Sequence, residues 1–330
     1  LKAIDETDFY PKKGKARIRS MIELRPDWCI SRQRTWGVPL PIFVSKKTNE
    51  VLKDPEVIEN IAKIYEKEGS DCWFTDDSQK FLGNKYNKKD FIKSTDICEV
   101  WFDSGSTHSF VLEKRDDLKW PASMYLEGSD QHRGWFHSSL LESCGTRGRA
   151  PYESILSHGF VVDGKGFKMS KSTGNIISPA DILKKYGADI LRVWVAASDY
   201  AEDLRIDFSI LDQHAESYRK IRNTFRFLLG NLQDQKTDIN FNSDKVLNWP
   251  DLEKYMLHKI YLLDQNFKFY FREYNFHKLY KDLLNFCSQD LSAFYFDIRK
   301  DTLYCDGKDS QTRKACINLL NILLDSLLKW

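Results

Sequence analysis

The chain has 330 residues, of which 42% are hydrophobic and 30% charged, and its formal net charge is +2 at pH 7. This composition excludes an intrinsically disordered chain, and the length suffices for two or three domains with separate cores. So small a net charge also excludes nucleic-acid binding through a global positive field, so any such contact must depend on local basic patches.

The seven cysteines stand singly, without a C-x-x-C pair. A zinc ribbon is therefore unsupported, and an odd, scattered set of thiols is typical of a reducing compartment. No apolar run reaches the length of a membrane span. Because the sequence begins at Leu1 without a methionine and ends at Trp330 inside an apolar helical pattern, we expect a piece of a longer chain.

Residues 1–24 are basic, and the segment 25–39 that follows holds three arginines and two tryptophans. Residues 28–30 and 40–44 are predicted to form short strands on either side of a glycine and proline turn. Arginine and tryptophan side chains suit contacts to phosphates and to stacked bases or sugars. A strand edge with solvated arginines explains the same pattern equally well.

Residues 46–98 are rich in lysine and aspartate and contain one amphipathic helical pattern near 55–67. This change of character predicts an inserted subdomain, and we find no residue pattern in it that indicates chemistry.

Residues 99–162 alternate between apolar runs and polar turns. We predict a strand at 100–106 that enters a glycine turn, a second strand at 124–127, a helix near 136–144 and further apolar strands at 154–158 and 160–162. Strand, polar turn, helix and strand in this order predict a parallel α/β unit, in which ligands bind beyond the carboxyl ends of the strands.

Polar side chains that suit a ribose or an amino-acid ammonium group follow the second strand. They are Glu127, Asp130, Gln131 and His132. Trp101 and Trp135 could form the walls of an apolar side-chain pocket, although core packing is the usual role of tryptophan. His158 is a candidate contact to a purine or phosphate, with a structural role as the alternative.

Residues 163–175 form a glycine-bracketed loop with three lysines and three hydroxyl side chains. Glycines let a backbone approach phosphates, and lysines supply point charges to phosphate oxygens. A solvated basic loop is the alternative. Residues 159–165 read G-x-x-x-x-G-K, but Gly166 stands where a P-loop needs serine or threonine, so a P-loop kinase or GTPase is excluded.

The rest of the chain is predicted to be helical. Residues 178–200 predict two short helices, with Ser178 and Pro179 at the start of the first and Gly187 at its end. Residues 211–330 predict an up-and-down helix bundle with helices at 253–272, 275–298 and 310–330, among others.

Taken together, these stretches resemble the isoleucyl-tRNA synthetases, a family of class I aminoacyl-tRNA synthetases. Residues 168–172 match the KMSKS signature of the class without change. Residues 25–39, 101–105, 127–136 and 296–301 are similar to the isoleucine enzymes more than to their valine, leucine or methionine relatives. The resemblance covers essentially the whole chain.

The resemblance implies an α/β fold, the second half of a Rossmann-like nucleotide-binding domain, followed by an all-α helix-bundle domain that binds the anticodon side of a tRNA. Its domains would be a return segment into the catalytic domain (1–45), an inserted subdomain (46–98), the catalytic half-domain with the KMSKS loop (99–210) and a truncated anticodon-binding domain (211–330). The HIGH motif, the editing domain and the C-terminal zinc region of the family are missing from the sequence. Phe167 departs from the basic residue common at its position.

The implied reaction is that of an isoleucine–tRNA ligase, the ATP-dependent activation of L-isoleucine and its transfer to tRNA(Ile). ATP and Mg²⁺ are implied as cofactors, with zinc only in the missing region, and we expect a cytoplasmic monomer without a membrane, or one in an organelle matrix. Since the HIGH motif is missing, we expect the isolated chain to be inactive. A non-catalytic RNA-binding protein built from a synthetase is the alternative.

The resemblance also assigns roles to single residues, and it implies no metal ligand in this chain. The predicted catalytic residues are Lys168 and Lys171. The predicted ATP-binding residues are His158, Lys168, Met169, Ser170, Lys171 and Ser172. The predicted aminoacyl-adenylate-binding residues are Trp101, Glu127, Gly128, Asp130, Gln131 and Trp135.

Overall fold

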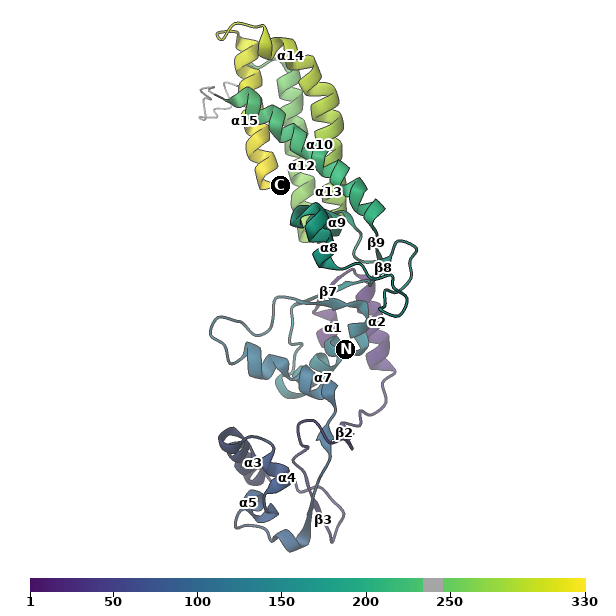
Figure 1. Ribbon diagram of the computed structural model, residues 1–330. Helices are drawn as coiled ribbons and strands as arrows, with labels where there is room; N and C mark the ends of the chain where they lie inside the picture. Colours follow the sequence, from purple (N-terminus) through teal and green to yellow (C-terminus); the bar gives the residue numbers. More distant parts are fainter. Residues whose placement is uncertain (234–245) are drawn as a thin grey trace. The chain divides into compact units, whose positions relative to one another are not determined.

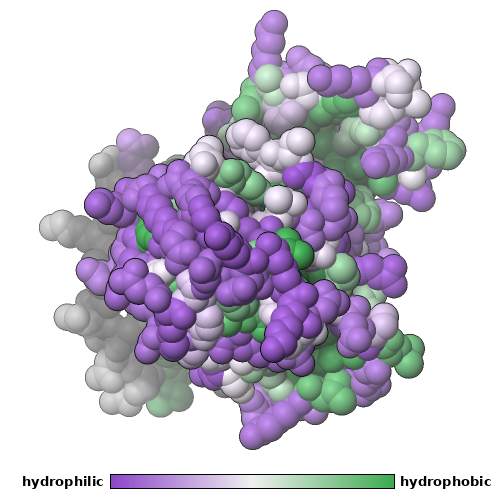
Figure 2. All heavy atoms as spheres, turned by 90° about the horizontal axis from the view of Figure 1, so that it is seen from below, coloured by the Kyte–Doolittle hydropathy of each residue, from purple (hydrophilic) through white to green (hydrophobic). Residues whose placement is uncertain are grey.

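The computed structural model describes residues 1–233 and 246–330, and the chain forms two compact units, residues 1–157 and 158–330 (Figure 1). Each unit has its own hydrophobic core and is described by itself. Figure 2 shows a face on which hydrophilic side chains predominate and hydrophobic ones are fewer.

A three-stranded sheet in the order β1-β7-β6 forms the centre of the first unit. Strand β1 (Asp8–Tyr10) pairs in parallel with β7 (Ser154–His158), and β6 (Tyr125–Gly128) lies on the other side of β7. The parallel pairing confirms the predicted α/β unit. Residues 154–157 are buried throughout, as expected of a central strand that is covered on both faces.

Helices cover this sheet and complete its core. They are α1 (Lys2–Asp5), α2 (Lys13–Glu23) and α7 (Trp135–Arg147). Ile4, Ile18 and Phe136 pack with Tyr152 and Ile155 in one buried cluster. The helix predicted near 136–144 is confirmed, whereas β1 and α2 were missed because the short strand and the basic helix carry little apolar periodicity.

The strand predicted at 100–106 is wrong, because these residues form helix α6 (Val100–Gly105). The side chain of Glu99 accepts a hydrogen bond from the backbone N–H of Trp101 at 3.2 Å and so caps the helix. A short apolar run gives no periodicity that separates a strand from one helical turn. A π-helical turn, η2 (His108–Leu112), follows.

The strand predicted at 28–30 is also wrong, since pairing begins only at β2 (Ser31–Arg32), antiparallel to β5 (Ile97–Cys98). The strand predicted at 40–44 is confirmed in shortened form as β3 (Phe43–Ser45), antiparallel to β4 (Phe91–Lys93). In both cases the strand limits are set by a partner far along the chain, which local sequence does not contain.

Residues between β3 and β4 form a small helical cluster with its own core. Its elements are α3 (Pro55–Glu68), α4 (Cys72–Thr75), α5 (Ser78–Leu82) and the 3-10 turn η1 (Lys88–Asp90). Trp73 is fully buried at its centre, between Phe43 and Phe81. The predicted helix near 55–67 is therefore confirmed, with the Asp54 side chain as its N-cap.

The second unit begins with a parallel pair of strands, β8 (Val161–Asp163) and β9 (Leu204–Ile206). Helices α8 (Pro179–Tyr186) and α9 (Ala188–Ala197) lie between them in the sequence and pack with β9 in a cluster that includes Ile182, Trp194 and Leu211. Ser178 caps α8 through the N–H of Ala180, and Gly187 ends it at φ +80°, as predicted.

Helices that run side by side make up the rest of the described residues (Figure 1). They are α10 (Phe208–Leu232), α12 (Asp251–Arg272), α13 (Phe276–Asn285), the π-helical η4 (Phe286–Tyr295), α14 (Phe296–Tyr304) and α15 (Gln311–Lys329). This confirms the predicted bundle, although the predicted helix at 275–298 continues to 304. In the described part of the chain, no helix is long and apolar enough to span a membrane.

A buried ion pair lies inside this bundle. The carboxylate of Glu253, on α12, is fully buried and accepts two hydrogen bonds from Arg299, on α14, at 2.7 and 2.8 Å. The hydroxyl of Tyr295 donates a third hydrogen bond to Glu253 at 3.0 Å. Since these three hydrogen bonds compensate the buried carboxylate, the cost of burying it is offset only while the whole group stays together.

We predict that Arg299→Met lowers the free energy of unfolding of the second unit by about 3–5 kcal/mol, because it leaves Glu253 charged and buried without its partner. Urea unfolding followed by circular dichroism measures this. Lys300→Met is the matched control, since Lys300 pairs with Asp297 on the exposed side of the same helix. Equal unfolding midpoints for the two variants would contradict the prediction.

Candidate functional site

The turn between β6 and α7 carries most of the predicted adenylate-binding residues. Gly128 ends the strand, residues 129–133 form the 3-10 turn η3, and Gly134 precedes α7. His132, which the sequence placed among the polar ligand contacts, is 1% exposed. Its Nδ1 donates to the carbonyl of Ser129 at 2.8 Å, so this side chain supports the turn from inside.

The remaining polar side chains of the turn are held by short local hydrogen bonds. Gln131 accepts from the N–H of Trp135 at 2.9 Å and donates to Asp130 at 3.1 Å. Glu127 accepts from the N–H of Gly128 at 3.1 Å. Asp130 and Glu127 are exposed, so their remaining carboxylate lone pairs face solvent and are available to a ligand.

The two tryptophans come from neighbouring helices and lie on either side of Gly134. A Cβ atom at Gly134 would lie 2.4 Å from the Gln131 amide oxygen and 3.1 Å from the Trp101 ring, so a larger residue would displace the Gln131 side chain. The Trp135 indole N–H donates to the carbonyl of Ser104 at 3.0 Å. The Trp135 ring stacks on Tyr125, with 4.0 Å between the ring centroids, so one face of Trp135 packs in the core. Trp101, by contrast, is 40% exposed.

Helices α6 and α7 approach each other closely at Gly105. A Cβ atom there would lie 2.1 Å from a carboxyl oxygen of Glu142, and that oxygen is buried without a hydrogen-bond partner among the described residues. Burial, and then the charge of Asp103, raise the pKa of Glu142 to about 8. A neutral carboxyl group therefore packs against α6 at neutral pH.

The predicted phosphate-binding loop is held in shape by two side chains. The carboxylate of Asp163 accepts from the N–H groups of Lys165 and Phe167 at 3.0 and 2.8 Å and from the Asn175 amide at 2.9 Å. Asn175 in turn accepts from the N–H of Ser170 at 2.9 Å. Gly166 has φ +89°, which favours glycine at the tip of this turn.

Within this loop the KMSKS residues divide into two groups. Met169 packs against the core cluster of α8, α9 and β9, and the Ser170 hydroxyl bonds to those of Ser172 and Thr173 at 3.0 and 2.7 Å, so these residues hold the loop together. Lys168 and Lys171 are exposed, and their ammonium groups have no hydrogen-bond or ion-pair partner in the described part of the chain. Two unpaired cations on an ordered loop suit an anionic ligand.

His158 ends β7, and its Nδ1 donates to the carbonyl of Gly159 at 2.7 Å. This bond places a proton on Nδ1, and in the neutral tautomer of the ring Nε2 is then an acceptor. His158 and the loop belong to the second unit, whereas Trp101 and the turn after β6 belong to the first. Each unit thus brings one set of predicted residues together.

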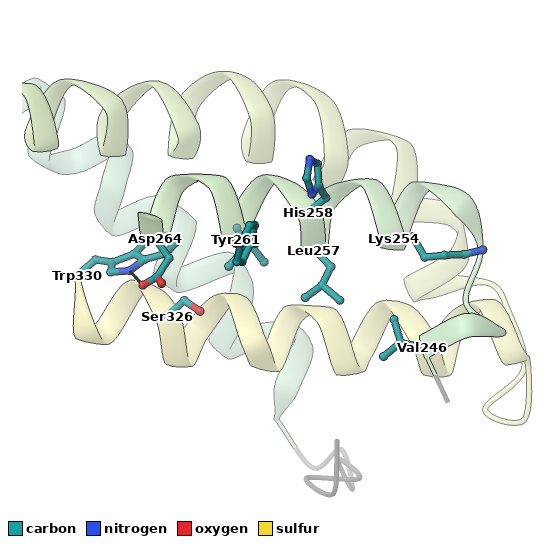
Figure 3. A pocket seen from close by; sticks show the side chains of 9 residues that line it. Val246, Lys254, Leu257, His258, Tyr261, Asp264, Ser326 and Trp330 are labelled. Carbon is teal, nitrogen blue, oxygen red and sulfur yellow. Dashed lines mark hydrogen bonds between the residues drawn. The ribbon is translucent and has the colours of Figure 1, made fainter. Parts of the chain in front are cut away.

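The bundle contains a cavity of about 530 Å³ between α12 and α15 (Figure 3). Leu257, His258 and Tyr261 line it from α12, and Ser326 and Trp330 from the other side, where the Trp330 indole donates to Asp264 at 3.4 Å. None of the residues predicted for the site lines this cavity. Among the described residues, no group of three or more histidine, cysteine or acidic side chains could hold a metal ion.

Comparison with known proteins matches two parts of the chain to two family models. Residues 1–207 match the family described as tRNA synthetases class I (I, L, M and V). The chain belongs to the class I tRNA synthetases. Residues 253–330 match the anticodon-binding domain of tRNA ligases.

Two curated relatives of this synthetase chain are both named isoleucine–tRNA ligase. The one from Pelagibacter ubique is 72% identical over the whole chain, and the one from Brucella abortus is 51% identical. The chain spans only 36% and 33% of the lengths of these two relatives. The identities confirm the resemblance to isoleucyl-tRNA synthetases.

Solved structures agree on the fold. One of them is the methionyl-tRNA synthetase of Mycobacterium tuberculosis in complex with methionyl-adenylate, with a TM-score of 0.65 and 15% sequence identity. The match covers 99% of this chain and 55% of the methionyl-tRNA synthetase chain. Another is a leucyl-tRNA synthetase from Agrobacterium radiobacter in complex with a tRNA, with a TM-score of 0.60 and 15% sequence identity. The match covers 95% of this chain and 42% of the leucyl-tRNA synthetase chain. Together with the family matches, they confirm the predicted fold class.

We predict that Gly14→Ala destabilises the first unit by about 1–3 kcal/mol, the usual cost of overpacking. The new Cβ atom would lie 2.8 Å from Nε2 of buried His132, which cannot move without the turn at 129–133. The control is Gly145→Ala in α7, where nothing lies within 4 Å. Gly145→Ala should raise the free energy of unfolding by up to about 1 kcal/mol, because alanine has a higher helix propensity than glycine. An increase in both variants would show that His132 does not hold the turn in place.

We predict that Glu142→Gln stabilises the chain increasingly as the pH rises. The folded protein holds the Glu142 proton more tightly than the unfolded chain, because its pKa is raised from 4.5 to about 8. The contribution of the neutral carboxyl is therefore complete below about pH 4.5 and is lost as the pH approaches 8. Thermal unfolding midpoints of the two proteins should coincide near pH 4 and diverge towards pH 8; a constant difference would refute the assignment.

Proposed function

We propose that this chain is part of an isoleucine–tRNA ligase that activates L-isoleucine with ATP and transfers it to tRNA(Ile). The observation that carries the proposal is the pair of unpaired ammonium groups, Lys168 and Lys171, on a loop ordered by Asp163 and Asn175. A loop shaped before the ligand arrives stabilises developing charge without reorganising during the reaction. The names of the relatives agree with this reaction.

In the first step, an oxygen of the isoleucine carboxylate attacks the α-phosphorus of ATP, and the bond to the bridging oxygen breaks to release pyrophosphate. Negative charge moves onto the leaving group, where Lys168 and Lys171 would neutralise it. Mg²⁺, which ATP carries into such sites, belongs to the same proposal. Nε2 of His158 would accept a hydrogen bond from the adenosine.

The turn after β6 would hold the adenylate. Carboxylates are the acceptors that an ammonium group or a ribose requires, and Glu127 and Asp130 present theirs to solvent on an ordered turn. Gly128 would let the backbone approach the ligand, and Gln131 would orient its polar end. The exposed face of Trp101 and the edge of Trp135 would enclose the isoleucine side chain.

In the second step, a hydroxyl of the terminal ribose of tRNA attacks the acyl carbon of isoleucyl-adenylate and AMP leaves. Residues 211–330 would carry the anticodon side of the tRNA, residues 99–210 the chemistry, residues 46–98 an insertion, and residues 1–45 the return of the chain into the catalytic domain. We assign the protein to the cytoplasm as a monomer, with zinc confined to regions outside this chain.

We predict that Lys171→Ala, in the full-length protein, lowers the rate of isoleucine-dependent ATP–pyrophosphate exchange roughly 10²–10³-fold, the usual effect of removing one charge-stabilising donor. Isoleucine affinity should change less than about twofold, because the lysine acts on the leaving group.

Lys165→Ala is the control for this variant, since Lys165 lies in the same exposed loop but outside the KMSKS residues. A similar loss of exchange in the two variants would mean that general loop charge, and not the placement of Lys171, matters. Loss of isoleucine binding in proportion to exchange would contradict a role in the transition state. If the wild-type protein showed no exchange at all, a non-catalytic RNA-binding protein would replace the proposal.

A further inference from the structure

A small cavity in the first unit lies against Trp101, and its charged lining residues have no role in the proposed adenylate site. Its volume is about 60 Å³. Its polar lining comes mainly from Arg25, Glu99, Arg133 and His137, and Trp28 and Trp101 form aromatic walls. A water molecule needs about 10–15 Å³, so the cavity has room for a few waters or one tetrahedral oxyanion but not for a base.

Two guanidinium groups meet at this cavity. Arg25 lies over the Trp28 ring at 5.1 Å, and Arg133 is exposed and has no hydrogen-bond or ion-pair partner in the part of the chain that the structure describes. The one carboxylate in the lining, Glu99, already caps α6 and lies 4.0 Å from Arg32. The cavity therefore carries an excess of positive charge.

His137 adds an unused donor to the same lining. Burial, and then the charges of Arg25 and Arg133, lower its pKa to about 4, so the ring is neutral. Arg25 can only donate, so Nε2 of His137 accepts its hydrogen bond at 3.2 Å and the ring proton resides on Nδ1. His137 is only 4% exposed. Its Nδ1–H is therefore buried, and it has no acceptor among the described residues.

An exposed aromatic side chain and another free arginine follow Trp28 in the sequence. Gly37, at φ +151°, packs so closely on Ile97 that a Cβ atom would lie 2.4 Å from it. Trp36, just before it, is 92% exposed, and Arg34 is exposed without a partner in the described residues. Trp36 lies on the same segment of the chain as Arg25 and Trp28, which line the cavity. Proteins hold single-stranded RNA through basic contacts to its backbone phosphates and aromatic side chains that stack on its bases.

We propose that the cavity between Arg25, Arg133 and His137 binds a backbone phosphate of a single-stranded RNA end, with Trp36 as a stacking surface for a nearby base. The proposal rests on the proposed function, because the second step requires the 3′ end of the tRNA to reach the aminoacyl group. Trp101 lines both this cavity and the proposed isoleucine pocket, so a phosphate held here lies next to the place where the end must react.

The test measures binding of a short fluorescein-labelled single-stranded RNA to the 330-residue chain by fluorescence anisotropy. Arg133→Gln should weaken binding roughly tenfold, the loss of a charge-assisted hydrogen bond. It should also reduce the slope of log K against log salt by about 0.7, the contribution of one phosphate contact on a single strand. Arg133→Lys keeps the charge, and its affinity for the RNA should stay within about threefold of that of the wild type.

Arg149→Gln is the matched control, since it removes the same charge from an exposed arginine of the same unit that lies over Trp120 and not in the cavity. Equal affinities of Arg133→Gln and Arg149→Gln for the RNA would overturn the proposal. Trp36→Ala should weaken RNA binding without changing the salt slope, and an unchanged affinity would remove the stacking role.

Inorganic phosphate, pyrophosphate and ATP serve as competing probes that separate an RNA phosphate from a free one. If Arg133→Gln weakens ATP or pyrophosphate binding and leaves RNA binding unchanged, the cavity serves the nucleotide and the proposal is overturned. These outcomes are independent of pyrophosphate exchange in the full-length protein, so failure of the cavity and failure of the proposed function are distinguishable.

Discussion

The close approach of α6 to α7 at Gly105 is the constraint on which the proposed site in the first unit depends. Since no side chain fits between Gly105 and Glu142, the two helices lie close enough for the Trp135 indole to reach the carbonyl of Ser104. This contact positions Trp101 beside the turn that follows β6. The same packing forms one wall of the basic cavity, so the proposed isoleucine pocket and the proposed RNA contact would respond together to any shift of α6.

In the second unit, the KMSKS loop is ordered although it remains exposed. Asp163 and Asn175 satisfy the backbone of the KMSKS loop, and Met169 anchors it to a hydrophobic core. The lysines are left without partners, so the loop keeps its charges for a ligand. Ordering by hydrogen bonds to the backbone, and not by ion pairs with the lysines, allows both rigidity and an unpaired charge in one short segment.

Particular elements show how far the sequence predicted the fold. The strands at 124–127 and 154–158 and the helices of the second unit were predicted because apolar periodicity and capping residues are local signals. The assignment at 100–106 failed because so short an apolar run has no periodicity that separates a strand from a helical turn. Of the residues in the proposed RNA contact, His137 had no local signal in the sequence, since its proposed role depends on Arg25, which lies more than a hundred positions earlier.

By itself, the sequence determined the family, the α/β and helical halves, and the identity of the charged loop, because motifs such as KMSKS and cap residues such as Ser178 act over a few positions. Only the tertiary structure decided which side chains are free to act. It buried His132 inside the turn, left Lys168 and Lys171 unpaired, and joined Arg25 to residues more than a hundred positions later. Burial and pairing depend on contacts between distant segments, which no local pattern records.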